Sequence, residues 1–201
     1  MIPFSDFQLS IPRLLVGLTL FAFLGCAAPP PVPERLEFLG YQGHVNEHQV
    51  VIQADSSQIF SVLTDFDRFV ALIPADRMQL SKATPGPYKV GTVLRAETKY
   101  KIKLQWHSQV VRVQKDRLLV LQFQDGPFRG GYELWELKPQ GSATRVSHTL
   151  VYNISNFLNR LVWVLKSGEK KHNTLTETTL QNLKLECEQE HPTNSVGGEG
   201  R

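Results

Sequence analysis

The turn signals between residues 78 and 152 constrain the fold of this chain more than any other feature of its sequence. Glycine, proline and aspartate recur at four places in this stretch, and such residues mark chain reversals. The signals stand at residues 85–87, 115–116, 125–127 and 140–141. The segments between them have the lengths of strands. This spacing predicts a meander of five or six antiparallel strands.

Alternation of apolar and polar residues identifies the side of the sheet that faces the core. It is clearest in residues 99–106, where apolar side chains alternate with three lysines and a glutamine. We therefore predict one strand over residues 99–106. We expect two later strands to share its buried face. The predicted inward positions of the three strands are Tyr100, Ile102, Leu104, Trp106, Leu119, Leu121, Phe123, Val146, His148, Leu150 and Tyr152.

Helical patterns stand on both sides of the predicted meander. A first strand over residues 45–53 leads into a helix cap at residues 54–57, and two short helices follow. Residues 65–67 separate these helices, and Pro74 ends the second. Ser155 is the predicted N-cap of a long closing helix. The positions that recur in this helix at spacings of three and four are Phe157, Leu158, Leu161, Leu165, Gly168, His172, Leu175, Thr179 and Leu183.

These patterns predict an α+β fold over residues 43–187. In this fold a curved antiparallel sheet of six to seven strands wraps around the long C-terminal helix, and two short helices follow strand one. The composition, 41% hydrophobic and 20% charged, is that of an ordinary folded domain. A net charge of only +3, with no block of five like charges, argues against a nucleic acid partner.

The N-terminal segment carries an export pattern. Arg13 precedes an apolar run over residues 14–24, which is short for a membrane span but suits a signal peptide. The sequence Gly25-Cys26-Ala27 follows at once and resembles the lipobox of bacterial lipoproteins. The resemblance implies that residues 1–26 form the signal and that Cys26 carries a lipid. Two alternatives are an uncleaved anchor helix and a signal cut near residues 27–28.

The segments that flank the domain have compositions of their own. Residues 27–42 are predicted to form a proline-rich linker, and residues 188–201 a disordered tail without apolar periodicity. We expect the protein in the bacterial cell envelope, facing the periplasm on a lipid anchor. The alternatives are secretion and attachment through an uncleaved N-terminal helix.

Several short motifs over residues 45–185 resemble the START-like helix-grip superfamily, in its polyketide cyclase and coenzyme Q-binding branch. They are Ile52-x-Ala54, Phe60-x-x-Leu63-x-Asp65-x-x-x-Phe69, Ile73-Pro74, Gly130-x-Tyr132-x-Leu134-x-x-Leu137 and Ser155-Asn156. The resemblance implies a helix-grip fold with a pocket between sheet and helix. Most members carry or sense sterols, phospholipids, quinones or other hydrophobic ligands, and a minority are cyclases or aromatases.

A strongly curved sheet cannot contact one helix along its whole width, so an apolar cleft is expected between them. We expect no cofactor and no metal. The residues predicted to line the ligand pocket are Tyr100, Leu104, Trp106, Leu121, Phe123, Tyr132, Leu134, His148, Leu150, Leu161 and Leu165.

Two histidine patterns have competing interpretations. His148 either presents a polar group to a ligand or is satisfied by a neighbouring strand or helix, and no second ionisable residue is predicted on its face. His44, Glu47 and His48 match the H-x-x-E-H order of some zinc peptidases. A strand separates the two histidines by about 13 Å, so we interpret this match as chance.

Three further features each have two interpretations. The lysines at positions 99, 101 and 103 form a row that either meets anionic lipids or is a solvated face. Gly168 either leaves room for a ligand or a bend, or packs closely on the sheet. Cys187 lies between two glutamates, which disfavour a reactive thiolate.

The sequence supports three functional hypotheses. The first is non-enzymatic binding or carriage of a lipid, quinone or polycyclic molecule in the cell envelope. The second is a cyclase-like enzyme in which His148, Tyr132 or Tyr152 polarises a substrate carbonyl. The third is an envelope interaction module that uses its sheet edge or its long helix.

Overall fold

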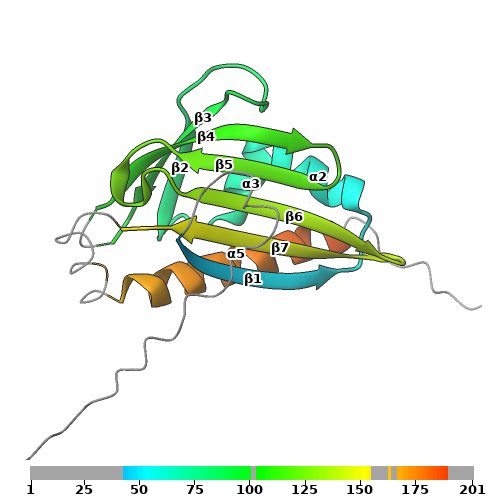
Figure 1. Ribbon diagram of the computed structural model, residues 1–201. Coiled ribbons are helices and arrows are strands. Elements are labelled where there is room, and N and C mark those ends of the chain that lie inside the picture. Colours follow the sequence, from blue (N-terminus) through cyan, green and yellow to red (C-terminus); the bar gives the residue numbers. More distant parts are fainter. Residues whose placement is uncertain (1–42, 101–102, 155–162, 164–166, 190–201) are drawn as a thin grey trace, which may run out of the picture.

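The computed structural model describes residues 43–100, 103–154, 163 and 167–189 (Figure 1). Its strands are β1 (His44–Ile52), β2 (Met78–Lys82), β3 (Val93–Thr98), β4 (Gln105–Gln114), β5 (Leu118–Phe123), β6 (Tyr132–Gln140) and β7 (Ala143–Tyr152). Its helices are α2 (Ser56–Thr64), α3 (Phe66–Leu72), the 3-10 turn η1 (Gly126–Phe128) and α5 (Gly168–Gln189). No helix in these ranges is long and apolar enough to cross a bilayer.

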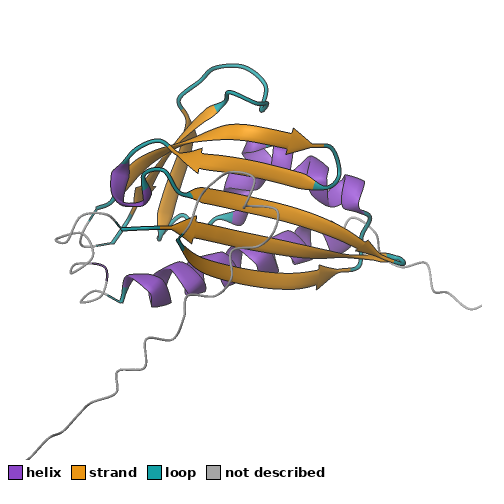
Figure 2. Ribbon diagram, in the orientation of Figure 1, coloured by secondary structure: helices purple, strands orange, loops and turns teal. Residues whose placement is uncertain are grey.

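The strands form one antiparallel sheet in the order β1-β7-β6-β5-β4-β3-β2. The first strand therefore pairs with the last, and His48 lies directly opposite His148. Figure 2 shows α2, α3 and α5 on the same side of the curved sheet. The predicted α+β helix-grip fold is confirmed, with seven strands, a long C-terminal helix and two short helices after strand one.

We call the side of the sheet that meets the helices the concave face, and the other side the outer face. Packed against the concave face are Leu180, Leu183 and Cys187 of α5, each at most 2% exposed. Burying each of the two leucines stabilises the fold by roughly 1.5–3 kcal/mol. A separate cluster on the outer face consists of Leu118, Val120, Tyr132, Leu134 and Val151.

Two aspartates begin the short helices in different ways. Asp65 accepts hydrogen bonds from the backbone N–H groups of Asp67 and Arg68, which caps α3. Asp55 occupies the same position before α2, but its side chain makes no capping hydrogen bond. The predicted break at residues 65–67 is therefore present and is stabilised by the Asp65 cap, which was not predicted from the sequence.

The predicted strand over residues 99–106 is wrong. β3 ends at Thr98 and β4 begins at Gln105, so the chain reverses in between. Thr98 holds this reversal, because its N–H donates to the Leu104 carbonyl and its hydroxyl accepts from the Leu104 N–H. Tyr100 and Leu104 look like strand positions because both line the interior. Tyr100 and Leu104 therefore show the alternation of a strand without belonging to one, and residues 101–102 lie outside the described residues.

The prediction that one helix runs continuously from Ser155 is also wrong. Ser167 has a φ of +53°, a left-handed conformation that an α-helix does not tolerate, and α5 begins at Gly168. Residues 155–162, including the predicted cap, lie outside the described residues. A Cβ atom at Gly168 would collide with the Trp163 indole, so this glycine is needed for close packing on Trp163.

Candidate ligand-binding pocket

A cavity of about 430 Å³ lies between the concave face of the sheet and the helices α3 and α5. Every strand from β2 to β7 contributes to its wall, and the reversal between β3 and β4 contributes Tyr100 and Leu104. Ligand sites in proteins span about 300–1,000 Å³. The predicted hollow between sheet and helix is therefore present and large enough for a small molecule.

The structure gathers six of the eleven predicted pocket residues around this cavity: Tyr100, Leu104, Trp106, Phe123, His148 and Leu150. Leu121 lines a neighbouring cavity of about 40 Å³. The placing of Tyr132 and Leu134 was wrong, because both belong to the outer-face cluster. Their neighbours Glu133 and Trp135 take the pocket positions. Leu161, Leu165 and Cys26 lie outside the described residues.

Aromatic rings form one wall of the cavity, with Phe128 at their centre. Its ring centroid lies 5.9 Å from that of Trp106, 5.6 Å from Phe123 and 5.2 Å from Trp163, in edge-to-face or tilted contacts. Such pairs are favourable beyond the area they bury. Gly126 permits this arrangement, because it has a φ of +73° and a Cβ atom there would collide with Trp106. The wall presents flat, rigid apolar surfaces to the interior.

A carboxylate interrupts the apolar lining on β6. Oε1 of Glu133 accepts hydrogen bonds from Nε1 of Trp135 at 2.9 Å and from Nε2 of His148 at 3.2 Å. An ionised carboxylate only accepts, so the proton of His148 is assigned to Nε2. Nδ1 of His148 is buried and has no hydrogen-bond partner within the described part of the chain.

These contacts decide the ionisation of Glu133. Burial acts to raise its pKa, but the interactions with His148 and the hydrogen bond from Trp135 outweigh burial, so the pKa lies below its usual value. Glu133 is therefore an anion at neutral pH. This finding changes the interpretation of His148, because the sequence predicted no ionisable residue beside it.

A second histidine reaches the cavity from α5. Burial, with smaller effects from His148 and His48, lowers the pKa of His172 to about 3, although the charge of Glu133 acts in the opposite direction. His172 is therefore neutral at physiological pH. Its ring centroid lies 6.2 Å from that of His148 and 6.5 Å from that of His48.

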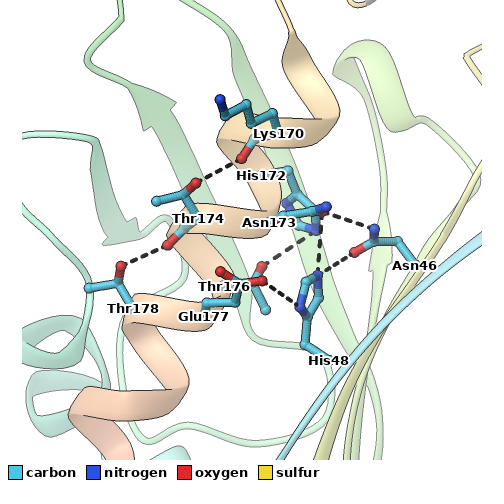
Figure 3. A network of polar contacts seen from close by, with 9 residues as sticks. All are labelled: Asn46, His48, Lys170, His172, Asn173, Thr174, Thr176, Glu177 and Thr178. Atoms are coloured by element: carbon cyan, nitrogen blue, oxygen red, sulfur yellow. Dashed lines mark hydrogen bonds and ion pairs between the residues drawn. The ribbon is translucent and has the colours of Figure 1, made fainter.

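Polar contacts join β1 to α5 (Figure 3). Nδ2 of Asn46 donates to Oδ1 of Asn173 at 3.0 Å, and Nε2 of His48 lies 2.9 Å from Oδ1 of Asn46. Nδ1 of His48 lies 3.6 Å from a carboxylate oxygen of Glu177. His48 thus joins the strand to the helix, which is a structural role for this half of the H-x-x-E-H match.

Other candidates from the sequence have ordinary surroundings. His44 contacts Tyr152, with 6.0 Å between ring centroids. Within the described ranges, no group of three or more His, Cys, Asp or Glu side chains is placed to hold a metal ion. Lys99 donates to Gln79, and Lys103 lies 3.8 Å from Glu97. Cys187 is fully buried.

Sequence reasoning missed Glu133 because strand β6 is apolar on both faces. Tyr132 and Leu134 suggested one inward face, whereas Trp135 and Leu137 mark the other. Glu133 stands two and four residues before Trp135 and Leu137, so a strand places all three side chains on one face. Giving Trp135 more weight than Tyr132 would have identified the carboxylate.

Several solved structures resemble the whole domain. TTHA0849 from Thermus thermophilus is 17% identical, covers 73% of this chain and 98% of its own, and gives a TM-score of 0.60. The KanY protein is 12% identical, with 74% and 99% covered and a TM-score of 0.61. Ms6760 from Mycobacterium smegmatis is 10% identical, with 73% and 92% covered and a TM-score of 0.53. At these identities the likeness shows a shared fold.

The sequence also matches a protein family directly. No curated protein matches it significantly. Residues 44–188 match the family model described as polyketide cyclase / dehydrase and lipid transport. This match covers all the described strands and helices except the last residue of α5, and it agrees with the START-like fold of the structural neighbours. The chain therefore belongs to the polyketide cyclase / dehydrase and lipid transport family.

Proposed function

We propose that this protein binds a hydrophobic small molecule in the cavity under α5 and releases it chemically unchanged. The observation that carries the proposal is a cavity of about 430 Å³ with a mostly apolar and aromatic lining. A family that includes lipid transport supports the same class of ligand. The candidate ligands are lipids, quinones and polycyclic compounds.

Binding is preferred over catalysis because the predicted polarising groups are poorly placed. A cyclase-like reaction needs a donor that points at a substrate carbonyl. The Nε2 proton of His148 is shared with Glu133, and Tyr132 lies on the outer face. The third candidate, Tyr152, packs its ring on Phe128 and Trp163.

We further propose that the domain works in the bacterial cell envelope, tethered through a lipid on Cys26 and the proline-rich linker. The support for this location is the apolar run over residues 14–24 with the small residues around Cys26. A tether of this kind would keep the pocket close to a membrane, which is a source of apolar ligands.

Native mass spectrometry of gently purified protein tests the binding function. We expect a bound apolar molecule, or uptake of at least one member of a lipid and quinone panel. A protein that is empty on purification and binds no member of the panel would refute the proposal.

A substitution that fills the cavity sharpens this test. Thr176 is 6% exposed and lines the cavity from α5, whereas Thr174 lies on the exposed side of the same helix. Thr176→Phe should weaken ligand binding by about tenfold or more, which corresponds to about 1.4 kcal/mol. Thr174→Phe is the matched control and should bind as the wild type does. Equal binding by both variants would place the ligand elsewhere.

A further inference from the structure

Glu133 has one carboxylate oxygen that its neighbours leave unused. Both hydrogen bonds to this side chain, from Trp135 and His148, end on Oε1. Oε2 receives no hydrogen bond from any residue that the structure describes. The side chain keeps 22% of its surface accessible, and Glu133 lines the main cavity.

An incompletely paired carboxylate in an apolar cavity is costly. Its two oxygens offer about four acceptor sites, and burying a charge without partners disfavours the folded state. The contacts with His148 and Trp135 keep Glu133 ionised, because they lower its pKa against the effect of burial. The cavity therefore contains a fixed carboxylate anion that can still accept a hydrogen bond from a donor.

We propose that Oε2 of Glu133 is the hydroxyl site of the pocket, which accepts a hydrogen bond from a hydroxyl group on an otherwise apolar aromatic ligand. This inference rests on the proposed binding function and narrows its ligand class. The aromatic wall around Phe128 takes the ring system, and Glu133 fixes its orientation. His148 and Trp135 are positioning residues, because they hold Oε1 and aim the carboxylate.

The charge of this site selects among polar groups. Ketones, ethers and oxidised quinones only accept hydrogen bonds, so they cannot pair with a carboxylate. Fatty acids and phosphates are anions, and the Glu133 carboxylate would repel them at this site. An ammonium group would lose more hydration than a hydroxyl does on entering the cavity, and the ammonium of Lys171 already lies at the wall, 5.1 Å from the Tyr100 ring. A hydroxyl donor fits best.

Three naphthalene probes test the hydroxyl site by isothermal titration calorimetry on the purified protein. 2-Naphthol offers a donor, 2-methoxynaphthalene offers the same oxygen without the donor, and 2-naphthoate is an anion. Hydrogen bonds to charged groups favour binding enough for about a tenfold effect or more. We expect 2-naphthol to bind about tenfold or more tightly than 2-methoxynaphthalene, and 2-naphthoate to bind most weakly.

A pair of variants on strand β6 provides the control. Glu133→Gln keeps the shape but replaces the charged acceptor with a neutral one of roughly half the hydrogen-bonding strength. It should reduce the preference for 2-naphthol over 2-methoxynaphthalene by about threefold or more, and it should weaken the rejection of 2-naphthoate. Glu136→Gln changes a carboxylate of the same strand that lies beside Lys138, away from the cavity lining. It should preserve the wild-type preference.

The outcomes separate the two proposals. If no probe binds and the lipid and quinone panel also fails, the binding function itself is refuted. If all three probes bind the wild type equally, or if 2-naphthoate binds most tightly, binding stands and the hydroxyl site is refuted. An unchanged preference in Glu133→Gln also refutes it. The wild-type series decides the question even if that variant does not fold.

Discussion

At the scale of single residues, the position of a side chain within a strand decides its chemistry. Glu133 and Glu136 are three residues apart on β6, so they point to opposite faces of the sheet. Glu133 meets Trp135 and His148 in the interior, while Glu136 lies 3.6 Å from Lys138. The position of Glu133 in the strand therefore places its carboxylate in the pocket, and residue type alone does not reveal this.

His172 makes the stability of the protein depend on pH. Its pKa falls from 6.5 to about 3 on folding. Between these pH values the imidazole of His172 binds a proton in the unfolded chain but not in the folded protein. Stability due to this residue is complete above pH 6.5 and is lost as the pH falls toward 3. The loss amounts to about 1.4 kcal/mol per pH unit.

Replacing His172 tests this dependence. His172→Gln should flatten the fall in unfolding free energy between pH 6.5 and pH 4.5 by about 1.4 kcal/mol per pH unit. Urea denaturation at pH 7.5, 6.5, 5.5 and 4.5 measures the slopes for variant and wild type. Parallel profiles would contradict the assigned pKa.

At the scale of elements, α2 and α3 differ in how they are capped, although an aspartate precedes each helix. Asp65 caps α3 with its side chain, whereas the side chain of Asp55 caps nothing at the start of α2. Asp65→Ala should therefore lower the unfolding free energy by about 1 kcal/mol. Asp55→Ala, the matched control, should cost distinctly less. Urea denaturation compares the two variants, and equal losses would show that the Asp65 hydrogen bonds contribute no stability.

The sheet could be predicted from the sequence because turn chemistry is local. All four turn signals coincide with breaks between strands, and Asp116 and Gly141 have the positive φ values that such turns require. The reversal after Thr98 carries no glycine or proline. It is held instead by the Thr98 hydroxyl, which accepts a hydrogen bond from the Leu104 N–H. The alternation of apolar and polar residues therefore indicates which side chains are buried, but it does not establish that the segment pairs as a strand.

The pocket could be predicted only in part, for the same reason. On β7 the outward positions 145, 147 and 149 are polar, so the inward face could be recognised, and His148 and Leu150 were predicted correctly as lining residues. On β6 both faces are apolar, because the outer face carries a cluster of its own around Leu134. The pairing of β6 with β5 and β7 decides which face of β6 packs toward α5. This pairing joins residues that are distant in sequence, so the local pattern does not reveal it.

At the scale of the whole molecule, the two cysteines give a clean test of the proposed lipid tether. Cys26 and Cys187 are the only cysteines, and Cys187 is fully buried in the core. In a bacterial host fed an alkyne-labelled fatty acid, the wild type and Cys187→Ser should both carry the label. Cys26→Ser should lose the label and move from the membrane fraction to the soluble fraction. Label retained on Cys26→Ser would contradict the tether.

All three tryptophans of the chain, Trp106, Trp135 and Trp163, border the large cavity described above. Indole emission depends on the polarity of the immediate surroundings, and here those surroundings are the cavity wall. Tryptophan fluorescence of the unlabelled protein thus reports the cavity, because no tryptophan lies elsewhere in the chain. The intrinsic emission of this protein should therefore change when a ligand occupies the cavity.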